Sequence, residues 1–141
     1  FQHNIEIGSF GGLSIDRCKE IYKDGRPFSY FIEPWIAENY NLTHVTGCKQ
    51  YDFVDPKNND IKYDAKTFTK GGCRFCPSNM LGQGRTFDED VFKEKTTALI
   101  FCIVSNIDFP NIKVRFVEGK ELIVKYPTGN IPSKDFIEFF N

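Results

Sequence analysis

Two aspartates and a lysine lie within a short stretch, at a spacing that suits phosphate chemistry. Asp52 and Asp64 are separated by eleven residues, and Lys66 follows Asp64 after a single alanine. Two neighbouring carboxylates are hard oxygen ligands of the kind that Mg²⁺ prefers, and Mg²⁺ keeps several waters and meets phosphate oxygens. Such an ion polarises a phosphodiester and helps to generate hydroxide from bound water. A lysine beside it orients that water or stabilises the charge that develops on the phosphate.

This chemistry needs the three side chains on one face, and a β-hairpin would place them there. The pattern predicts a strand at 50–54, a turn-rich segment at 56–60 and a strand that alternates with period two at 61–69. If the turn centres near Asn58, Asp52 lies directly opposite Asp64, with β-carbons about 4.5–5.5 Å apart. Lys66 then projects from the same face, whereas Asp55 has the wrong parity for it.

The middle of the chain is its basic part. Residues 49–85 carry seven bases and four acids, and no acid occurs between Ala65 and Phe87. A polyanion such as nucleic acid would bind to the basic side chains of this segment. The alternative is a plain solvated strand face, in which Asp52 pairs with Lys66 or Lys62; the hairpin geometry and the basic continuation favour the active-site interpretation over it.

The flanking patterns predict an α/β (α+β) domain with a mixed central sheet flanked by helices. Apolar residues recur at helical spacing from Phe28 to Tyr40, with Pro34 either kinking this helix or marking its first turn. An earlier short helix is expected to end near residues 25–27. The remaining predictions are a helix at 87–95, an apolar strand at 98–104, an added C-terminal hairpin at 112–117 and 122–126, and a short helix through Phe140 that Ser133 caps. We expect one domain over 1–141.

Asp52, eleven residues, and then Asp64-Ala65-Lys66 resembles the PD-(D/E)xK motif of restriction-endonuclease-like nucleases. The order of helix, hairpin, helix 87–95 and strand 98–104 is similar to the core of that family, so the resemblance covers about residues 28–104. Two departures are Tyr51, where the family's motif has proline, and an aspartate as second acid, where glutamate is commoner.

The resemblance implies a DNA endonuclease that hydrolyses phosphodiester bonds with Mg²⁺, or Mn²⁺ in its place, of a type II restriction-like, phage or mobile-element kind. Asp52, Asp64 and the Ala65 carbonyl would hold the metal, and Lys66 would attend the attacking water. Family members often recruit a glutamate from the first helix; Glu33 is the candidate, with Glu38 and Glu20 as rivals. Because cutting both strands needs two sites, a homodimer is expected.

Several side chains after the motif are of types that read base edges or grip phosphates. We predict that these contact DNA: Lys70, Arg74, Asn79, Gln83 and Arg85. Ordinary surface charge explains the two arginines equally well.

A second constellation predicts a different metal. His44-x-x-x-Cys48 and Cys73-x-x-Cys76 are two pairs of N/S ligands that suit a closed structural Zn²⁺ site. The hairpin register would place residue 44 opposite about residue 72 and so bring the pairs together. The alternative function is therefore a non-enzymatic, zinc-braced module that binds nucleic acid or protein; ordinary thiols are the simpler explanation of the same residues.

The amino-acid composition narrows the classes of protein to which this chain could belong. A hydrophobic fraction of 40% with 16% aromatic residues fills a core, and no apolar run approaches the roughly 20 residues of a membrane span, so no membrane partner is expected. Five cysteines, an odd count, favour a reducing, cytoplasmic setting. The net charge of −1 excludes a histone-like binder, and the two histidines lie in no recognisable nucleophile motif.

Overall fold

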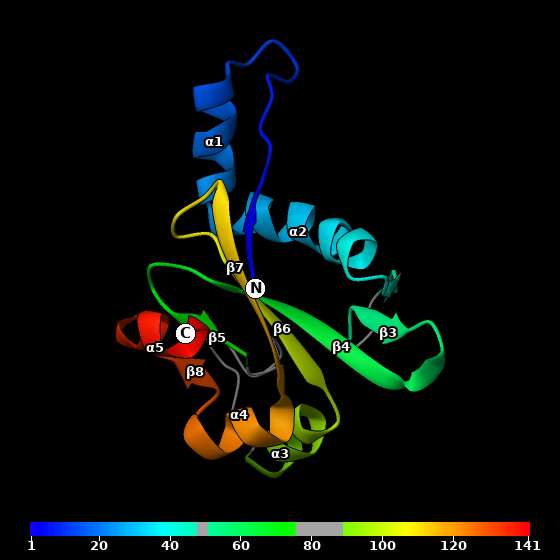
Figure 1. Ribbon diagram of the computed structural model, residues 1–141. Coiled ribbons are helices and arrows are strands. Elements are labelled where there is room, and N and C mark those ends of the chain that lie inside the picture. The colour runs from blue at the N-terminus through cyan, green and yellow to red at the C-terminus, as the bar shows by residue number, and fades with distance from the viewer. Residues whose placement is uncertain (48–50, 76–88) are drawn as a thin grey trace.

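The computed structural model describes residues 1–47, 51–75 and 89–141 (Figure 1). Its helices are α1 (Ile15–Lys23), α2 (Gly25–Asn39), α3 (Glu89–Thr97), α4 (Gly119–Lys125) and α5 (Phe136–Phe140), the last preceded by a 3₁₀ turn, η2 (Ser133–Asp135). Its strands are β1 (Gln2–Asn4), β2 (Thr43–His44), β3 (Phe53–Asp55), β4 (Asn58–Phe68), β5 (Cys73–Arg74), β6 (Ile100–Ser105), β7 (Asn111–Glu118) and β8 (Asn130–Ile131). The chain is a mixed α/β protein, as predicted.

A six-stranded mixed sheet organises the described part of the chain, in the order β1-β7-β6-β4-β3-β2. All neighbours are antiparallel except β4 and β6, which run parallel from the pair Tyr63–Ile100 to the pair Phe68–Ser105. Parallel neighbours need a crossover connection, and the chain between these strands contains α3. A small second sheet pairs β5 with β8.

Alternating residues of the central strands supply two hydrophobic cores, one on each face of the sheet. Cys102 and Val104 of β6 pack in a cluster with Phe28, Ile32 and Ile36 of α2. Phe101 and Ile103 belong to the other cluster, which takes in residues of α3, α4 and α5. Figure 1 shows α2 on one side of the sheet and α3 and α4 on the other. The apolar run predicted as a strand at 98–104 therefore contains β6, which begins at Ile100 and is buried on both faces, and this explains why the run lacks alternation.

Helix α2 follows α1 almost directly, because Asp24 ends the first helix and caps the second. The Arg26 backbone N–H donates to Asp24 Oδ1 at 3.1 Å, and Pro27 lies in the first turn, where its missing N–H costs nothing. Pro34 lies inside the helix and is exposed. The predicted boundary near 25–27 is thus the junction between two helices, and the second begins at Gly25.

The β3–β4 hairpin has the predicted register but a different turn. Phe53 pairs with Tyr63 and Val54 with Lys62, as expected, yet Asp55 pairs with Asn58, so the turn is Pro56-Lys57 and is not centred near Asn58. An irregularity leaves residues 59–61 of β4 without partners on β3. Phe53 is fully buried, and a slip by one residue would turn it to the opposite face. Core packing, more than the turn, accounts for the register.

The prediction of a C-terminal hairpin at 112–117 and 122–126 is wrong. Residues 111–118 form β7, which pairs with β6, but 119–125 form helix α4. Leu122, Ile123 and Tyr126 are buried at helical spacing in the core that α3 also covers. A Cβ on Gly119 would lie 1.8 Å from the Thr96 carbonyl oxygen, so this position accepts only glycine.

The last helix exists as predicted, but its predicted cap is wrong. Ser133 is the first residue of η2, Pro132 precedes it, and no side chain caps this turn. Three features were not predicted from the sequence: β1, which pairs with β7, the edge strand β2, and the β5–β8 pair. Neither β5 nor β8 exceeds two residues, too few to show a pattern. No helix among the described residues is long and apolar enough to cross a bilayer.

Candidate active site on the β3–β4 hairpin

The two aspartates of the motif meet across the β3–β4 hairpin. Asp52 directly precedes β3, and its backbone N–H donates to the Tyr63 carbonyl at 2.8 Å, which continues the register of Phe53 with Tyr63. The Asp52 carboxylate accepts a hydrogen bond from the Ala65 backbone N–H at 2.8 Å through Oδ2. This bond ties the first acid to the backbone between Asp64 and Lys66. The predicted juxtaposition of the two aspartates is therefore present.

Lys66 joins the aspartates from the same strand. Its Nζ lies 3.1 Å from Asp64 Oδ2, and the two side chains are 27% and 14% exposed. In the parallel register Asp64 lies beside Phe101 and Lys66 beside Ile103, both buried. An ion pair against apolar neighbours is screened weakly, so its charges act strongly on whatever binds there.

This environment shifts the proton affinities of both partners. Burial raises the pKa of the Asp64 carboxyl to about 7; the Lys66 ammonium opposes the rise, and Asp52 adds to it. Burial lowers the pKa of Lys66, but Asp64 and then Asp52 outweigh it, so the net shift is upward. Lys66 is therefore an ammonium at neutral pH, whereas Asp64 is only partly ionised there, and a bound cation would favour its carboxylate form.

Helix α2 brings a third carboxylate to the edge of this cluster. Glu33 is half-buried, and burial and Asp52 raise its pKa while His44 and Lys66 lower it. Its Oε2 lies 3.2 Å from His44 Nε2 on β2. Of the rival candidates, Glu20 forms an ion pair with Arg17 on α1, and the exposed Glu38 lies five residues after Glu33, about 140° further around the helix. Glu33 is the glutamate of the three whose charge acts on the motif.

The donor set fits a hard divalent cation. Across residues 1–47, 51–75 and 89–141 no three His, Cys, Asp or Glu side chains gather closely enough to enclose an ion by themselves. Mg²⁺ does not require this, because it is bound through one or two carboxylates and retains waters. Asp52 and Asp64 would supply those carboxylates, and the raised pKa of Asp64 reflects a burial that a bound cation would offset. A role of the Ala65 carbonyl as ligand stays a prediction.

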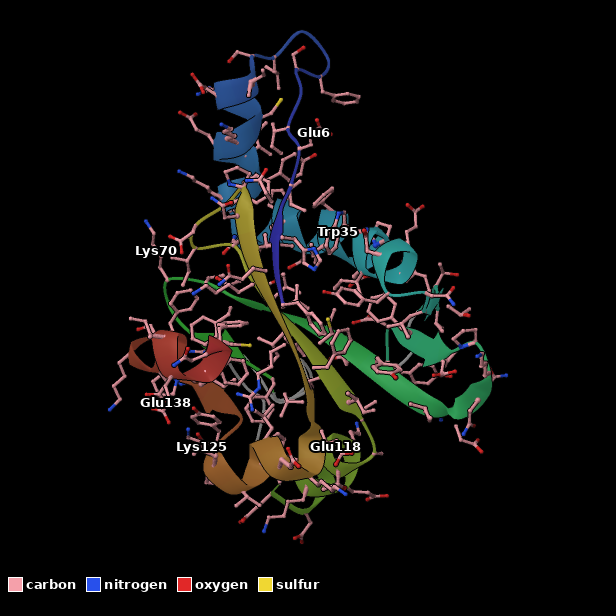
Figure 2. The ribbon with its side chains drawn as sticks, viewed as in Figure 1. Glu6, Trp35, Lys70, Glu118, Lys125 and Glu138 are labelled. Atoms are coloured by element: carbon pink, nitrogen blue, oxygen red, sulfur yellow. The ribbon has the colours of Figure 1, made fainter. Side chains whose placement is uncertain are left out.

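Two of the predicted DNA contacts are exposed cations on the chain that follows the motif. Lys70 lies in the turn after β4, where Figure 2 shows it at the periphery near the base of α1. Arg74 lies on β5, paired in register with Asn130. Asn79, Gln83 and Arg85 lie outside the described residues.

The register on which the zinc prediction depended is wrong. His44 pairs with Phe53 on β3, and Gly72 bridges back to Thr69 in its own tight turn. The Cys73 side chain is buried in the second core, and burial raises the pKa of its thiol to about 12, with Lys66 opposing, which does not favour a thiolate ligand. Cys48 and Cys76 lie outside the described residues, so Zn²⁺ binding itself stays a prediction.

His44 as the partner of Glu33 is a site feature that the sequence analysis missed. The spacing of His44 in the sequence pointed to Cys48 as its partner, and no signal in the chain connects a helix at 25–39 with a two-residue strand at 43–44.

Comparison of the chain with protein-family models, with curated proteins and with solved structures finds no match in any of the three. The geometry at β4 is therefore what bears on function.

Proposed function

We propose that the protein is a metal-dependent deoxyribonuclease of the restriction-endonuclease-like kind, which hydrolyses phosphodiester bonds in DNA. The observation that carries the proposal is the convergence of Asp52 and Asp64 across one hairpin, with Lys66 Nζ 3.1 Å from Asp64. Two carboxylates and an ammonium that lie together on one face of the hairpin match the requirements of phosphodiester hydrolysis.

Each residue has a role that follows from its place. Asp52 and Asp64 would hold the cation, Mg²⁺ or Mn²⁺, which when bound would supply Lewis-acid polarisation of the phosphate and an activated water. The Lys66 ammonium stabilises the charge that grows on the phosphate oxygens as the P–O bond breaks. The Ala65 N–H fixes the Asp52 carboxylate, so this ligand is oriented before substrate arrives.

The arrangement of elements supports the family assignment. Helix α2, hairpin β3–β4, helix α3 and strand β6 follow one another in the order expected of the core over about residues 28–104, and α2 and α3 lie on opposite sides of the sheet. The substrate is DNA, with a type II restriction-like or mobile-element role. Because one site cuts one strand, a homodimer is the form that would cut both. A cytoplasmic location is part of the proposal, and the odd number of cysteines, five, supports it.

Incubation with supercoiled plasmid in Mg²⁺, Mn²⁺ or EDTA tests the proposal. We expect cleavage with either ion and none with EDTA. Asp64→Asn should lose cleavage by about 10²–10³-fold, on the scale seen when a charge-stabilising group is removed. Asp60→Asn is the matched control, because it makes the same change on the same strand at an exposed position.

Retention of DNA binding by Asp64→Asn would separate loss of chemistry from loss of fold. If the purified protein binds DNA but cuts none with any divalent cation, the nuclease proposal fails. The binding module predicted from the sequence would then be the remaining function.

A further inference from the structure

His44 lies at the same end of the sheet as the carboxylates, on the edge strand β2. Its ring packs on buried Phe53, with centroids 5.6 Å apart and planes at 36°. The next residue, Val45, donates its N–H to the Asp52 carbonyl at 2.8 Å. One contact thus fixes the imidazole on the hairpin and the other ties β2 to the first acid of the motif.

The link between α2 and β2 sets the distance from this imidazole to Glu33. The Leu42 N–H donates to the Ala37 carbonyl at 3.0 Å, and Asn41 takes a positive φ of 53°, which turns the chain sharply after the helix. His44 Nε2 then lies 3.2 Å from Glu33 Oε2. Two elements that are joined by a tight turn therefore place a nitrogen donor against a carboxylate.

That carboxylate needs a partner to stay where it is. Glu33 is half-buried and feels the like charge of Asp52; both effects favour turning its flexible side chain into solvent, and they outweigh the attraction of Lys66. A hydrogen bond from a ring held by Phe53 opposes this. We propose that His44 is a positioning residue, which holds the Glu33 carboxylate at the border of the Asp52–Asp64–Lys66 cluster.

The inference rests on the proposed function and extends it to two residues. Held in this way, Glu33 presents a fixed hydrogen-bond acceptor to the waters that surround a cation on the aspartates. His44 acts on the reaction through Glu33 and needs no contact with substrate. Partners that orient a ligand in this manner typically change activity by 10–100-fold when they are removed.

A double-mutant cycle with four variants tests the inference: His44→Ala, His44→Gln, Glu33→Ala and the double variant Glu33→Ala/His44→Ala. We expect His44→Ala to lower kcat by about 10-fold or more and to leave KM for DNA unchanged. The double variant should be no slower than Glu33→Ala, because a residue that acts through Glu33 has no effect once Glu33 is gone. His44→Gln keeps a side-chain N–H donor and should recover part of kcat.

His3→Ala is the matched control. His3 is the other histidine, on β1 at the opposite edge of the sheet, where its Nε2 lies 2.6 Å from the Tyr40 hydroxyl. This variant should cut at the wild-type rate. Additive losses from Glu33→Ala and His44→Ala, or a His44→Ala variant that cuts normally, would overturn the inference.

Failure of the proposed function gives a different result. If the wild-type protein does not cut, the same four variants are compared by urea unfolding without metal. If the losses in the free energy of unfolding are non-additive, the His44–Glu33 contact is established although the nuclease proposal fails. If these losses are additive, the positioning role of His44 is overturned independently of the nuclease proposal.

Discussion

Asp64 has a side chain that is 14% exposed and lies 3.1 Å from the Lys66 ammonium, yet burial raises its pKa to about 7. A carboxylate in this position opposes folding and at the same time attracts a cation. Such a conflict between stability and chemistry at single residues is common in active sites. Substitution of this single residue therefore distinguishes an effect on the proposed activity from an effect on the stability of the fold.

The pH dependence of stability follows from that shift. An unfolded aspartate titrates near 3.8 and folded Asp64 near 7, so between these values the folded protein binds a proton that the unfolded chain has released. The free energy of unfolding should therefore fall as pH rises from about 4 to about 7, and stay level above it. Asp64→Asn removes this loss and should stabilise the metal-free protein at pH 7.5 by on the order of 1–3 kcal/mol.

Urea unfolding at pH 4.5 and 7.5 measures this, with Asp60→Asn as the control that keeps the wild-type slope. Mg²⁺ should stabilise the wild-type protein at pH 7.5 and leave Asp64→Asn unchanged. A variant that is less stable than wild type at both pH values would contradict the burial argument.

At the scale of elements, the β3–β4 hairpin decides whether the motif is a site. The turn Pro56-Lys57 by itself would extend a register in which Asp52 faces Ile61, three residues short of Asp64. The unpaired residues 59–61 take up the difference, and buried Phe53 opposite Tyr63 restores the register that joins the aspartates. The irregularity is therefore what makes a short turn compatible with the site.

Deletion of Asn59 tests whether the core or the turn controls this register. If the Phe53–Tyr63 pair controls it, the unpaired stretch absorbs the deletion, and Mg²⁺-dependent cleavage should stay within about 10-fold of wild type. Phe53→Ala should instead cost about 3–5 kcal/mol of stability through the lost core contacts. Plasmid cleavage and urea unfolding of both variants give the comparison. A folded deletion variant without activity would show that the turn controls the register.

At the scale of the whole molecule, α2 and β4 run side by side from the Glu33 and Asp64 carboxylates to the start of α2 and the end of β4, where the neighbouring side chains are basic. Ser29 Oγ lies 2.8 Å from Thr67 Oγ1, and a Cβ on Gly25 would lie 3.3 Å from Thr69 Cγ2. The neighbours of this end, Arg26 and Lys70, are exposed and form no ion pair with any residue of the described segments. From Glu33 to Gly25 the helix spans about 12 Å. That length corresponds to three or four base pairs of duplex.

This layout predicts where phosphates are gripped. Arg26→Ala/Lys70→Ala should weaken duplex binding, measured by fluorescence anisotropy in Ca²⁺, and lower the slope of log K against log salt by about 2, since each phosphate contact contributes about 0.9. The control is Lys93→Ala/Lys125→Ala, which removes the same charge from lysines that pair with Glu89 and Glu138. Figure 2 shows Lys125 and Glu138 together, below Lys70. If the two double variants weaken duplex binding equally, DNA responds to the overall charge of the protein and does not follow a defined path along Arg26 and Lys70.

Patterns between residues that are close in the sequence determined most of the central helices and strands of this protein. The alternation of β4, the apolar run of β6 and the recurrence along α2 are local, and each predicts an element that the structure contains. The opposition of Asp52 and Asp64 was also predicted from one hairpin, but the burial of Phe53, and not the turn, sets the register that produces it. Glu33 was found less directly, through the family resemblance, since its place on a helix says nothing about what that helix packs against.

Tertiary structure decided what depends on distant contacts. The sequence pattern at residues 122–126 suits a strand, but the hydrophobic core shared with α3 and the close approach of Gly119 to Thr96 make residues 119–125 a helix. The His44–Glu33 contact and the raised pKa of Asp64 likewise arise from elements that pack across the sheet edge. Burial and partner choice are properties of the packed chain, because they depend on which surfaces meet; sequence spacing defines only which faces are available to meet.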